Sequence, residues 1–515
     1  MKKIILSIIV IILLSTISIA PINAFELNCK ESQNIEHVVV NNAPFNGYTL
    51  LNPWLSRNTY LINNTGSVVH KWQSKYYGGL PAYLLENGSL IRGSVAYNKD
   101  LLRLLLGGGF SRTWDAWHGG LGGRVEMFDW DGNRIWNFEF INETHCLHND
   151  IEVLPNGNIL MTVWDYKTKD EAIAAGFDPN SKMLKDYGFA LIDYIMEVEP
   201  TGQTSGNIVW EWHAWNHLIQ DLDESKNNYG VVAGRPGLLD INYEGRPFDI
   251  THINSLEYIK EFDQILISAR HNSEIWVIDH STNTTEAAGH EGGNSSKGGD
   301  ILYRWGNPQV YNRGDENDRK LFYQHDARWF TEPGFPDEVH ITIFNNGYNR
   351  PEGEYSTVEE IIPPVDENGN YYLNPLVPSY PGPAYGPKET IWNYTADPPE
   401  DLFSIEMSGA QRLPNGNTFI CSGNHGHLYE VTPSNEIVWE YINPYPYPAY
   451  LINSVFKTQC YPKDYPGIST LSFDNGIESL ESEHVSIEAV SLSNIKQSTI
   501  LNLFIEQQFS RFMLQ

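Results

Sequence analysis

The chain has 515 residues, with 64 acidic and 34 basic side chains and a formal net charge of −30 at pH 7. This excess of Asp and Glu repels phosphate backbones, which argues against a nucleic-acid partner, and an anionic substrate would need locally concentrated positive groups. Aromatic residues make up 13% of the chain and there are 42 glycines, as expected for β-strands joined by turns.

The first 24 residues have the features of a secretory signal peptide. Two lysines precede an apolar run from Ile4 to Ala20, and Ala24 before Phe25 offers a small residue for cleavage. The run is nearly long enough to cross a bilayer, so an uncleaved membrane anchor is the alternative. Either way we expect the rest of the chain outside the cytoplasmic membrane, as a periplasmic, extracellular or membrane-anchored protein.

Export would permit two covalent modifications. The chain has four cysteines, Cys29, Cys146, Cys421 and Cys460. Outside the cytoplasm they allow three full disulfide pairings, of which a Cys29–Cys460 bridge would join the two ends of the repeat region. No Cys-X-X-Cys motif favours a zinc or redox site. Asn-X-Ser/Thr sequons, which would make the exported chain a glycoprotein, occur at Asn63, Asn87, Asn142, Asn283, Asn294 and Asn393.

A short aromatic phrase recurs six times, each time ending a strand-like segment. A second phrase containing Asn-Gly, at residues 85–90, 154–159 and 413–418, supplies the positive-φ pair of a tight hairpin turn. Repeats of about 40 to 50 residues built from short strands predict an all-β, six-bladed β-propeller over residues 25–467. A β-sandwich with coincidental tryptophan spacing is the alternative. The aromatic phrases contain Trp72, Trp136, Trp210, Tyr303, Trp392 and Trp439.

Three insertions interrupt the repeats. Residues 165–187 include a short predicted helix ended by Gly176, and residues 213–249 include a second predicted helix near their start. Residues 345–387 are rich in Pro, Tyr and Gly, which predicts a loop without regular strand pairing. Long loops on one rim of a scaffold usually shape its site. The last segment, 468–515, is acidic and then weakly amphipathic, and it does not fit the repeat.

Three histidines, His148, His252 and His325, begin strand-like segments in the second, third and fourth repeats. Blades are related by rotation about one axis, so we expect the three rings at equivalent positions around one mouth of the propeller. A hairpin follows the strand of His252, and Arg270 ends the strand after that hairpin. We therefore expect Arg270 at the same mouth. Single histidines often tie propeller loops together, but three in register beside an arginine favour a functional cluster.

Imidazoles and a guanidinium without a paired carboxylate fit two kinds of chemistry. Three histidines can hold zinc, copper or iron with one open position. Arg270 counts against a metal, because a guanidinium cannot ligate and repels a cation. An anionic group with several oxygens suits the set better, since imidazole can attack it or move a proton and arginine binds two of its oxygens. The adjacent Asp326 and His271 are expected to point away along extended chain and to be structural.

Five phrases, in their order and separation, carry a resemblance to a known family. They are HNDIEVLPNGN from His148, DITHINS from Asp249, ISARH from Ile267, FYQHDAR from Phe322 and VFKTQCYP from Val455. With these phrases, residues 46–466 resemble the arylsulfotransferase (aryl-sulfate sulfotransferase) family.

The resemblance implies a propeller enzyme that moves a sulfuryl group from an aryl sulfate to a phenolic acceptor by a ping-pong route, without a nucleotide donor, a cofactor or a metal. By similarity, His325 matches the nucleophile that forms a sulfohistidine. His252 matches the acid/base that protonates the departing phenolate and deprotonates the incoming phenol. His148 and Arg270 match the groups that bind the sulfuryl oxygens.

One departure from the family pattern adjoins His148. The family commonly has a second histidine before the aspartate of this phrase, and Asn149 replaces it here. The nearby His145 is the candidate to compensate. Two competing hypotheses are an exported propeller that binds or scaffolds without catalysis, and a metal-dependent hydrolase or lyase.

Overall fold

The chain divides into two compact units, Met1–Glu36 and His37–Gln515, and every residue that the structure describes belongs to the second. The expected signal segment, Cys29 and nearly all of the tail after residue 467 lie outside the described residues. No helix within those residues is long and apolar enough to cross a membrane. This computed structural model describes residues 38–40, 44–96, 122–243, 249–332, 335–373, 383–445 and 453–469.

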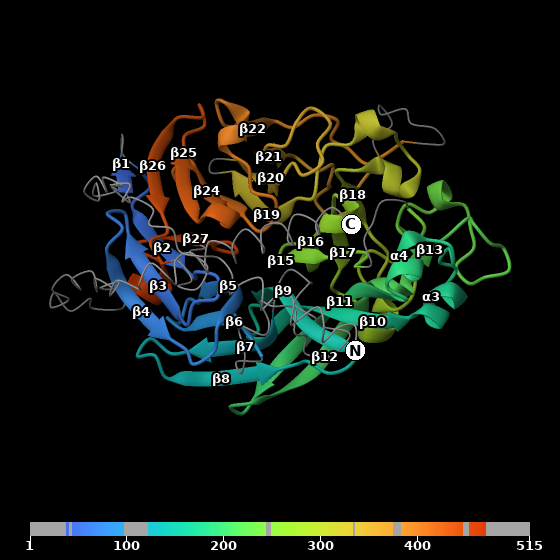
Figure 1. Cartoon of the computed structure of the whole chain (residues 1–515), viewed down its shortest axis with the longest axis horizontal. Helices are drawn as coiled ribbons and strands as arrows, with labels where there is room; N and C mark the ends of the chain where they lie inside the picture. Colours follow the sequence, from blue (N-terminus) through green and yellow to red (C-terminus); the bar gives the residue numbers. More distant parts are fainter. Residues whose placement is uncertain are drawn as a thin grey trace, which may run out of the picture. The chain divides into compact units, whose positions relative to one another are not determined.

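Six antiparallel sheets form the blades of a β-propeller (Figure 1), which confirms the predicted fold class and blade count. From the innermost strand outward, the blades are: blade 1, β27 (Gln459–Pro462), β2 (Gly47–Leu51), β3 (Asn58–Asn63) and β4 (Val68–Gln73); blade 2, β5 (Gly78–Leu84), β6 (Leu90–Val95), β7 (Gly123–Phe128) and β8 (Arg134–Glu139); blade 3, β9 (His145–Val153), β10 (Ile159–Thr168), β11 (Phe189–Thr201) and β12 (Ser205–His213); blade 4, β15 (Ile253–Ile259), β16 (Gln264–Ala269), β17 (Glu274–Asp279) and β18 (Tyr303–Trp305); blade 5, β19 (His325–Glu332), β20 (Phe335–Asn345), β21 (Thr357–Ile361) and β22 (Trp392–Thr395); blade 6, β23 (Gly409–Arg412), β24 (Thr418–Ser422), β25 (His427–Val431), β26 (Ile437–Ile442) and β1 (Val38–Val40).

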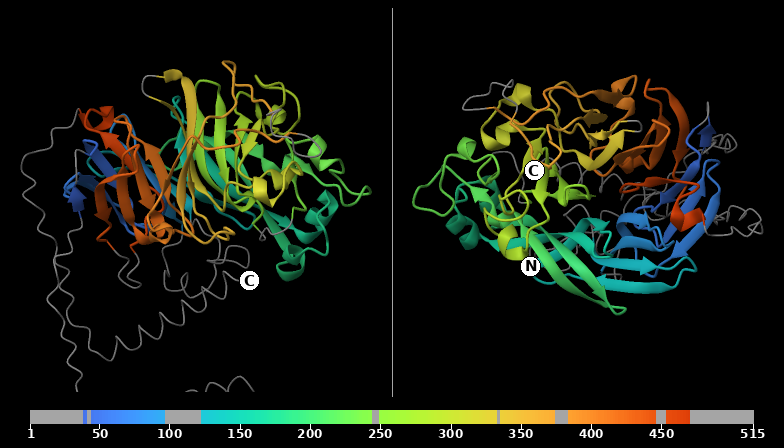
Figure 2. Two further views of the ribbon diagram at one scale, coloured as in Figure 1. Left: turned by 90° about the horizontal axis from the view of Figure 1, so that it is seen from above. Right: turned by 180° about the vertical axis from the view of Figure 1, so that it is seen from behind.

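The two ends of the propeller sequence close the ring. Strand β27, from the end of the described chain, is the innermost strand of blade 1, and β1 pairs with the outer strand β26 of blade 6 (Figure 2). Backbone hydrogen bonds therefore close the ring within the described chain, whereas the expected Cys29–Cys460 bridge involves Cys29, which lies outside the described residues. In the described part of the chain, Cys146, Cys421 and Cys460 are buried free thiols.

The recurring aromatic phrase is the outermost strand of each blade, and its tryptophans explain the repeat. Each indole N–H donates a hydrogen bond to the following blade, so six equivalent bonds pass around the ring and connect blade 6 back to blade 1. The phrase with Tyr303 at its centre uses the next aromatic residue for this bond. The bonds are Trp72 to Asp129 O (3.0 Å), Trp136 to Ser205 O (3.0 Å), Trp210 to Thr282 Oγ1 (3.2 Å), Trp305 to Pro387 O (2.8 Å), Trp392 to Pro433 O (3.1 Å) and Trp439 to Asn64 O (2.8 Å).

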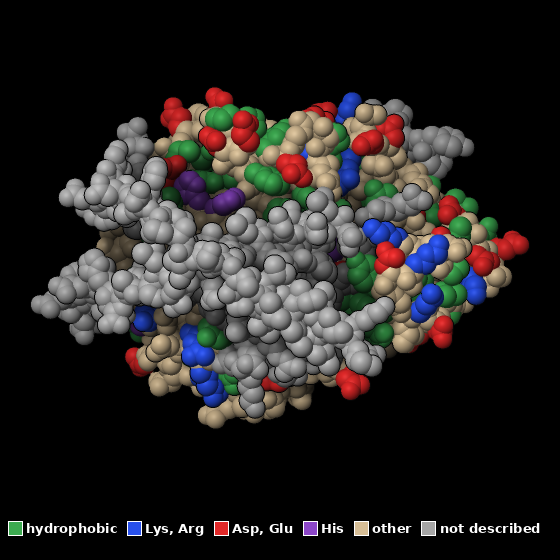
Figure 3. Space-filling model, in the orientation of Figure 1, with side chains coloured by type: hydrophobic (Ala, Val, Ile, Leu, Met, Phe, Trp, Pro, Cys, Tyr) green, Lys and Arg blue, Asp and Glu red, His purple; other side chains and the backbone are tan. Residues whose placement is uncertain are grey.

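The apolar core follows the same plan. Six large clusters of buried hydrophobic side chains each lie between two neighbouring blades. The cluster between blades 1 and 2 contains Leu50 and Leu84, and the one between blades 6 and 1 contains Leu428 and Leu51. Burial of apolar area at these interfaces drives ring formation. Among the side chains coloured in Figure 3, Lys and Arg are interspersed with Asp and Glu.

The insertions agree with the sequence analysis in part. The predicted helix before Gly176 is α3, whose N-cap Thr168 and Glu171 form a capping box, and Gly176 ends it with a φ of 104°. The predicted helix near His217 is wrong, because the Gln220 side chain binds the backbone N–H groups that such a helix would use. Instead, β13 (Leu218–Ile219) pairs with β14 (Leu239–Asp240).

Residues 345–387 also differ from the expectation of a loop, because they contain β21 of blade 5. Regular pairing is possible there since residues 357–361 contain no proline. The helical segments of the described chain are α3 (Lys169–Ala175), α4 (Lys182–Asp186), α5 (Thr284–Ala287), α6 (Pro466–Ser469), η1 (Ala214–Asn216), η2 (Val232–Gly234), η3 (Arg270–Asn272), η4 (Pro308–Tyr311), η5 (Glu316–Asp318), η6 (Pro399–Asp401) and η7 (Gly423–His425).

Candidate active site

The three predicted histidines lie near the starts of the inner strands of three adjacent blades. His325 is the first residue of β19, His252 directly precedes β15, and His148 is the fourth residue of β9. They belong to blades 3, 4 and 5 instead of the second to fourth repeats, because the aromatic phrase ends a blade and does not begin one. Arg270 follows β16 and is the first residue of η3.

The expectation that the three rings occupy equivalent positions does not hold along the strands. Each of the three inner strands has an irregularity in its pairing with the second strand of its blade, at residues 148–150 in β9, at Asn254 in β15 and at Asp326 in β19. His148 lies within this irregularity, His325 directly precedes it, and His252 precedes it by two residues. A φ of 46° at His252 redirects the chain before β15. Side chains at these irregularities bind the next blade: Asn149 donates to Ile253 O, Asn254 donates to Gln324 O, and Asp326 accepts from Ala410 N–H.

The structure nevertheless brings the four predicted residues together. The ring centroids of His148 and His252 are 6.1 Å apart, and the backbone N–H of Arg270 donates to the carbonyl oxygen of His252 at 3.2 Å. Arg270 and His252 also lie close enough to His325 to lower the pKa of its imidazole, in addition to the larger effect of burial. These residues come from three consecutive blades, so the packing of adjacent blades makes them neighbours.

His148 is buried and held on two sides. Its ring stacks on Trp164 with centroids 3.9 Å apart, and its Nε2 lies 2.5 Å from Oδ1 of Asp193. Asp193 also accepts from the backbone N–H of Ile253 at 2.8 Å, so its oxygens are acceptors and His148 Nε2 carries the hydrogen. Among the described residues, His148 Nδ1 is buried without a hydrogen-bond partner. Such an atom is costly to bury, which marks Nδ1 as a ligand-binding atom.

His252 is paired with a carboxylate, contrary to the expectation of a cluster without paired carboxylates. Its Nδ1 lies 2.5 Å from Oδ2 of Asp249, and Trp164 Nε1 donates to the same oxygen at 3.1 Å. Burial, and next the nearby Asp193, raises the pKa of Asp249 well above its usual range. With Nδ1 engaged by Asp249, proton exchange between His252 and a substrate would use Nε2.

His325 is held in one tautomer by Asn346. The Asn346 amide nitrogen donates to the carbonyl oxygens of Ser404 at 2.6 Å and Met407 at 3.2 Å, and its Oδ1 lies 2.8 Å from His325 Nδ1. Because an amide oxygen only accepts, Nδ1 carries the hydrogen and Nε2 the lone pair. Nε2 accepts from Met407 N–H at 3.2 Å. Burial and then Arg270 lower the pKa of His325 well below its usual range, so the ring is neutral near pH 7.

His271 lies in the cluster and does not point away from it, as the sequence analysis expected. Its ring centroid is 4.6 Å from that of His252, and its Nε2 accepts from Arg270 Nη1 at 2.9 Å. Since Nε2 is the acceptor, Nδ1 carries the hydrogen and donates to the backbone oxygen of Asp249 at 2.6 Å. The Arg270 guanidinium also lies 5.1 Å from the centroid of the Tyr323 ring. His271 therefore positions Arg270.

The cluster does not fit a metal ion. Asp249, His252 and His271 each place one possible ligand atom within 4.8 Å of the others. Both ring nitrogens of His271 are already in hydrogen bonds, one of them with the cationic Arg270. Two ligands remain, fewer than the three protein ligands usual at a catalytic zinc site.

Asp326 is structural, as predicted. Lys457 Nζ lies 2.8 Å from Oδ2 of Asp150 and 2.9 Å from Oδ1 of Asp326, and all three side chains are buried. Asp326 Oδ2 also accepts from Arg328 Nε at 2.8 Å. Lys457 lies two residues before β27 of blade 1, so its ammonium group joins this segment to the inner strands of blades 3 and 5.

His145 does not take the place of the ring that Asn149 replaces. Its Nε2 lies 3.5 Å from Oδ1 of Asp165, and its ring packs edge-on against Tyr194 with centroids 5.7 Å apart. Asn149 has a φ of 51°, a conformation that asparagine tolerates better than most residues. Its side chain therefore supports the bulge beside His148.

Three residues of the cluster escaped the sequence analysis: Asp193, Asp249 and Asn346. Asp249 had a local signal, because it stands three residues before His252 in the phrase DITHINS. Asp193 and Asn346 had none, since 45 and 21 residues separate them from the histidines that they bind.

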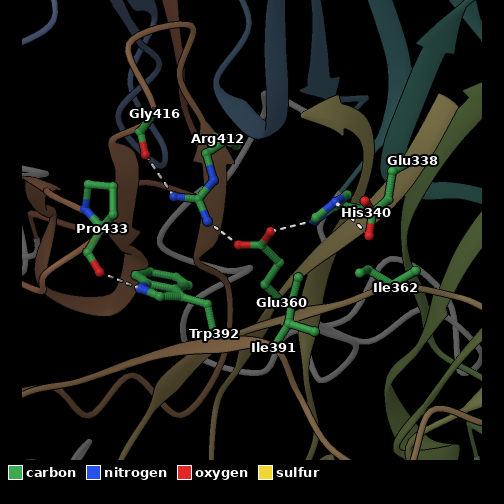
Figure 4. A pocket seen from close by; sticks show the side chains of 9 residues that line it. All are labelled: Glu338, His340, Glu360, Ile362, Ile391, Trp392, Arg412, Gly416 and Pro433. Atoms are coloured by element: carbon green, nitrogen blue, oxygen red, sulfur yellow. Dashed lines mark hydrogen bonds and ion pairs between the residues drawn. The ribbon is translucent and has the colours of Figure 1, made fainter. Parts of the chain in front are cut away.

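A cavity in the described chain lies elsewhere. About 390 Å³ in volume, it lies between blades 5 and 6 and shares no residue with the histidine cluster (Figure 4). Its polar groups already bind one another: Arg412 donates to Glu360, which lies 2.7 Å from His340 Nδ1, and Trp392 donates to Pro433 O. A ligand would have to break these pairs, so the cavity is not the candidate site.

Comparisons with known proteins give one family match and several distant structural matches. Residues 56–371, more than half of the chain, match the sequence model of the arylsulfotransferase (ASST) family. No curated protein matches the chain.

Solved structures that resemble this chain do so at low identity. A protein of unknown function from Bacteroides caccae has a TM-score of 0.41 and 10% identity, covering 80% of this chain and 98% of its own. A putative 6-phosphogluconolactonase from Bacteroides fragilis has a TM-score of 0.37 and 8% identity, covering 81% of this chain and 98% of its own. The periplasmic gluconolactonase of Pseudomonas aeruginosa has a TM-score of 0.35 and 9% identity, covering 80% of this chain and 98% of its own. None of them carries an argument about function.

Proposed function

The chain belongs to the arylsulfotransferase family, and from that premise we propose that it transfers a sulfuryl group from an aryl sulfate to a phenol through a sulfohistidine on His325. The observation that carries the proposal is the convergence of His148, His252, Arg270 and His325 from three blades. The signal-like first 24 residues support action outside the cytoplasmic membrane.

In the first half of the proposed reaction, Nε2 of His325 attacks the sulfur of the aryl sulfate. The nitrogen–sulfur bond forms as the bond from sulfur to the aryl oxygen breaks. His252 gives a proton from Nε2 to the departing phenolate, which leaves as a phenol. The neutral ring and the Nδ1 hydrogen fixed by Asn346 leave the Nε2 lone pair for the attack. The 3.2 Å contact from Met407 N–H has to open first.

In the second half, the acceptor phenol takes the place of the released one. His252, now without the transferred proton, removes the proton of the phenol as the phenol oxygen attacks sulfur. The nitrogen–sulfur bond breaks, which regenerates His325 and releases a new aryl sulfate. Asp249 keeps His252 in one orientation through both proton transfers.

The sulfuryl oxygens carry the spreading negative charge in both halves. Arg270 supplies a fixed cation, and His148 Nδ1 is a buried ring nitrogen without a partner among the described residues. To donate from Nδ1, His148 must be an imidazolium, and Asp193 at 2.5 Å supports that charge. Such fixed donors each contribute on the order of 3 kcal/mol to transition-state stabilisation. They also offset the long-range repulsion that a net charge of −30 exerts on an anionic donor.

The test uses the full chain with a chromogenic aryl sulfate. With a second phenol present, we expect acceptor-dependent release of the donor phenol and formation of the new aryl sulfate. With donor alone, rapid quenching and peptide mass spectrometry should find one sulfuryl adduct on the peptide that contains His325.

His325→Asn should lose both the adduct and turnover while its thermal unfolding stays close to that of the wild type. His280→Asn is the control, because His280 lies outside the cluster, where it pairs with Glu197 and Asp263. Turnover by His325→Asn, or an adduct on another side chain, would show that the nucleophile is misassigned. Donor hydrolysis that requires a metal and no acceptor would favour a metal-dependent hydrolase.

A further inference from the structure

Three potential metal ligands meet outside the histidine cluster, where loops of blades 3 and 4 touch. His217 follows η1 after blade 3, whereas His290 and Asp300 lie in the connection between β17 and β18 of blade 4. Oδ1 of Asp300 lies 2.9 Å from His217 Nδ1 and 2.7 Å from His290 Nδ1. The ligand atoms of all three lie within 4.8 Å of one another.

The hydrogen bonding of His217 directs a lone pair at Asp300. His217 is 1% exposed, and its Nε2 lies 2.8 Å from the carbonyl oxygen of Ala287. A carbonyl oxygen only accepts, so Nε2 carries the hydrogen and Nδ1 of the neutral ring carries a lone pair. That lone pair faces a carboxylate oxygen. The contact is repulsive unless the ring is protonated or a cation lies between the two atoms.

A metal ion accounts for this arrangement without a buried charged ring. Histidines that bind metals almost always donate their second ring N–H to a carbonyl or carboxylate oxygen, as His217 does to Ala287. Ligand atoms on a tetrahedral zinc ion lie about 2.0 to 2.2 Å from it and hence roughly 3.3 Å from one another. The observed distances need a small outward shift: His290, which is 45% exposed, can lengthen the 2.7 Å, and Asp300, which is 18% exposed, can lengthen the 2.9 Å to the buried His217.

The buried ligand, by contrast, is preset by close packing. The Trp212 ring stacks beside His217 with centroids 5.7 Å apart and its Nε1 donates to Gly299 O at 2.7 Å. A Cβ atom at Gly299 would lie 2.6 Å from His217 Nε2, so glycine at this position allows the ring to sit there.

We propose that His217, His290 and Asp300 bind a zinc ion, with water completing the coordination. Two imidazoles and one carboxylate suit zinc, whereas calcium and magnesium prefer oxygen ligands. The site shares no residue with the candidate active site and does not depend on sulfuryl transfer. The ion links the segment after blade 3 to the long loop of blade 4.

The experiment measures zinc bound by the full chain. The protein is stripped with a chelator, dialysed against micromolar zinc chloride, and analysed for metal by mass spectrometry. We expect one zinc per chain, a higher melting temperature with zinc than without, and visible absorption bands of tetrahedral cobalt when cobalt replaces zinc. His290→Ala and Asp300→Asn should bind zinc at least about a hundredfold more weakly.

His271→Ala is the control that separates the two clusters of possible ligands. It removes a member of the Asp249, His252 and His271 group and should leave the zinc content at one per chain. No zinc on the stripped and reloaded wild type would overturn the proposal, and so would full zinc content in His290→Ala and Asp300→Asn. Loss of zinc in His271→Ala alone would also overturn it, because the metal would then lie in the other cluster.

Discussion

Nδ1 of His252 lies 2.5 Å from Oδ2 of Asp249, and both side chains are buried. Burial, with Asp193 as the next cause, raises the pKa of Asp249 well above its usual range. Asp249 therefore contacts His252, the residue that we propose transfers the proton.

Asp249→Asn tests this pair. The amide keeps the shape but cannot stabilise the His252 imidazolium, so we expect kcat to fall by about 10³ to 10⁴. The loss should be larger for donors with a basic leaving phenolate than for donors with a weakly basic one, because basic phenolates need the proton more. Steady-state kinetics over a series of aryl sulfates measures this. Asp263→Asn, which alters the partner of His280 instead, should match the wild type.

Arg270→Lys tests the anion contact. An ammonium cannot reproduce the planar fork of arginine, so we expect a loss of about 3 kcal/mol of transition-state stabilisation, which is roughly 10²-fold in kcat/KM. Arg313→Lys is the control, because Arg313 binds backbone oxygens in other loops of the described chain, Ala233 O and Pro383 O. Kinetics equal to the wild type in Arg270→Lys would remove Arg270 from the site.

Folding stability should depend on pH through His325. Burial first and Arg270 second lower its pKa in the folded state, so the unfolded chain binds more protons below about pH 6.5. Its contribution is present above about pH 6.5 and is lost as pH falls toward the folded-state pKa. The raised pKa of Asp249 acts in the opposite direction. The effect of His325 is therefore the difference in pH dependence between the wild type and a variant that lacks this histidine.

We therefore expect the free energy of unfolding to fall less steeply with decreasing pH in His325→Asn than in the wild type, by up to about 1.4 kcal/mol per pH unit. Urea unfolding between about pH 7.5 and about pH 5 measures this slope. Equal slopes would mean that His325 titrates normally in the folded protein.

Lys457→Met tests the buried ion cluster. The substitution leaves Asp150 and Asp326 without their shared cation, so we expect a loss of about 3 to 5 kcal/mol of unfolding free energy. Urea denaturation checks this value. Lys320→Met is the control, since Lys320 is partly exposed and lies 3.8 Å from Glu389, and such pairs contribute about 1 kcal/mol or less. A loss no larger than that of the control would contradict a structural role for the cluster.

Much of the fold follows from local patterns. The six aromatic phrases could be counted because each supplies an indole N–H to the next blade, and the predicted helix before Gly176 follows from its own cap. The predicted helix near His217 failed because the Gln220 side chain accepts hydrogen bonds from the backbone N–H groups of Leu222 and Asp223.

The sequence by itself determined the repeat, the blade count and the four residues expected in the cluster, because a local phrase of a few residues marks each of them. The tertiary structure decided which groups surround them. It pairs His148 with Asp193, brings His271 against His252, and sets the three histidines at different positions relative to the pairing irregularities of their strands. These features depend on bulges, on a positive φ and on contacts between strands distant in sequence, and no local pattern encodes them.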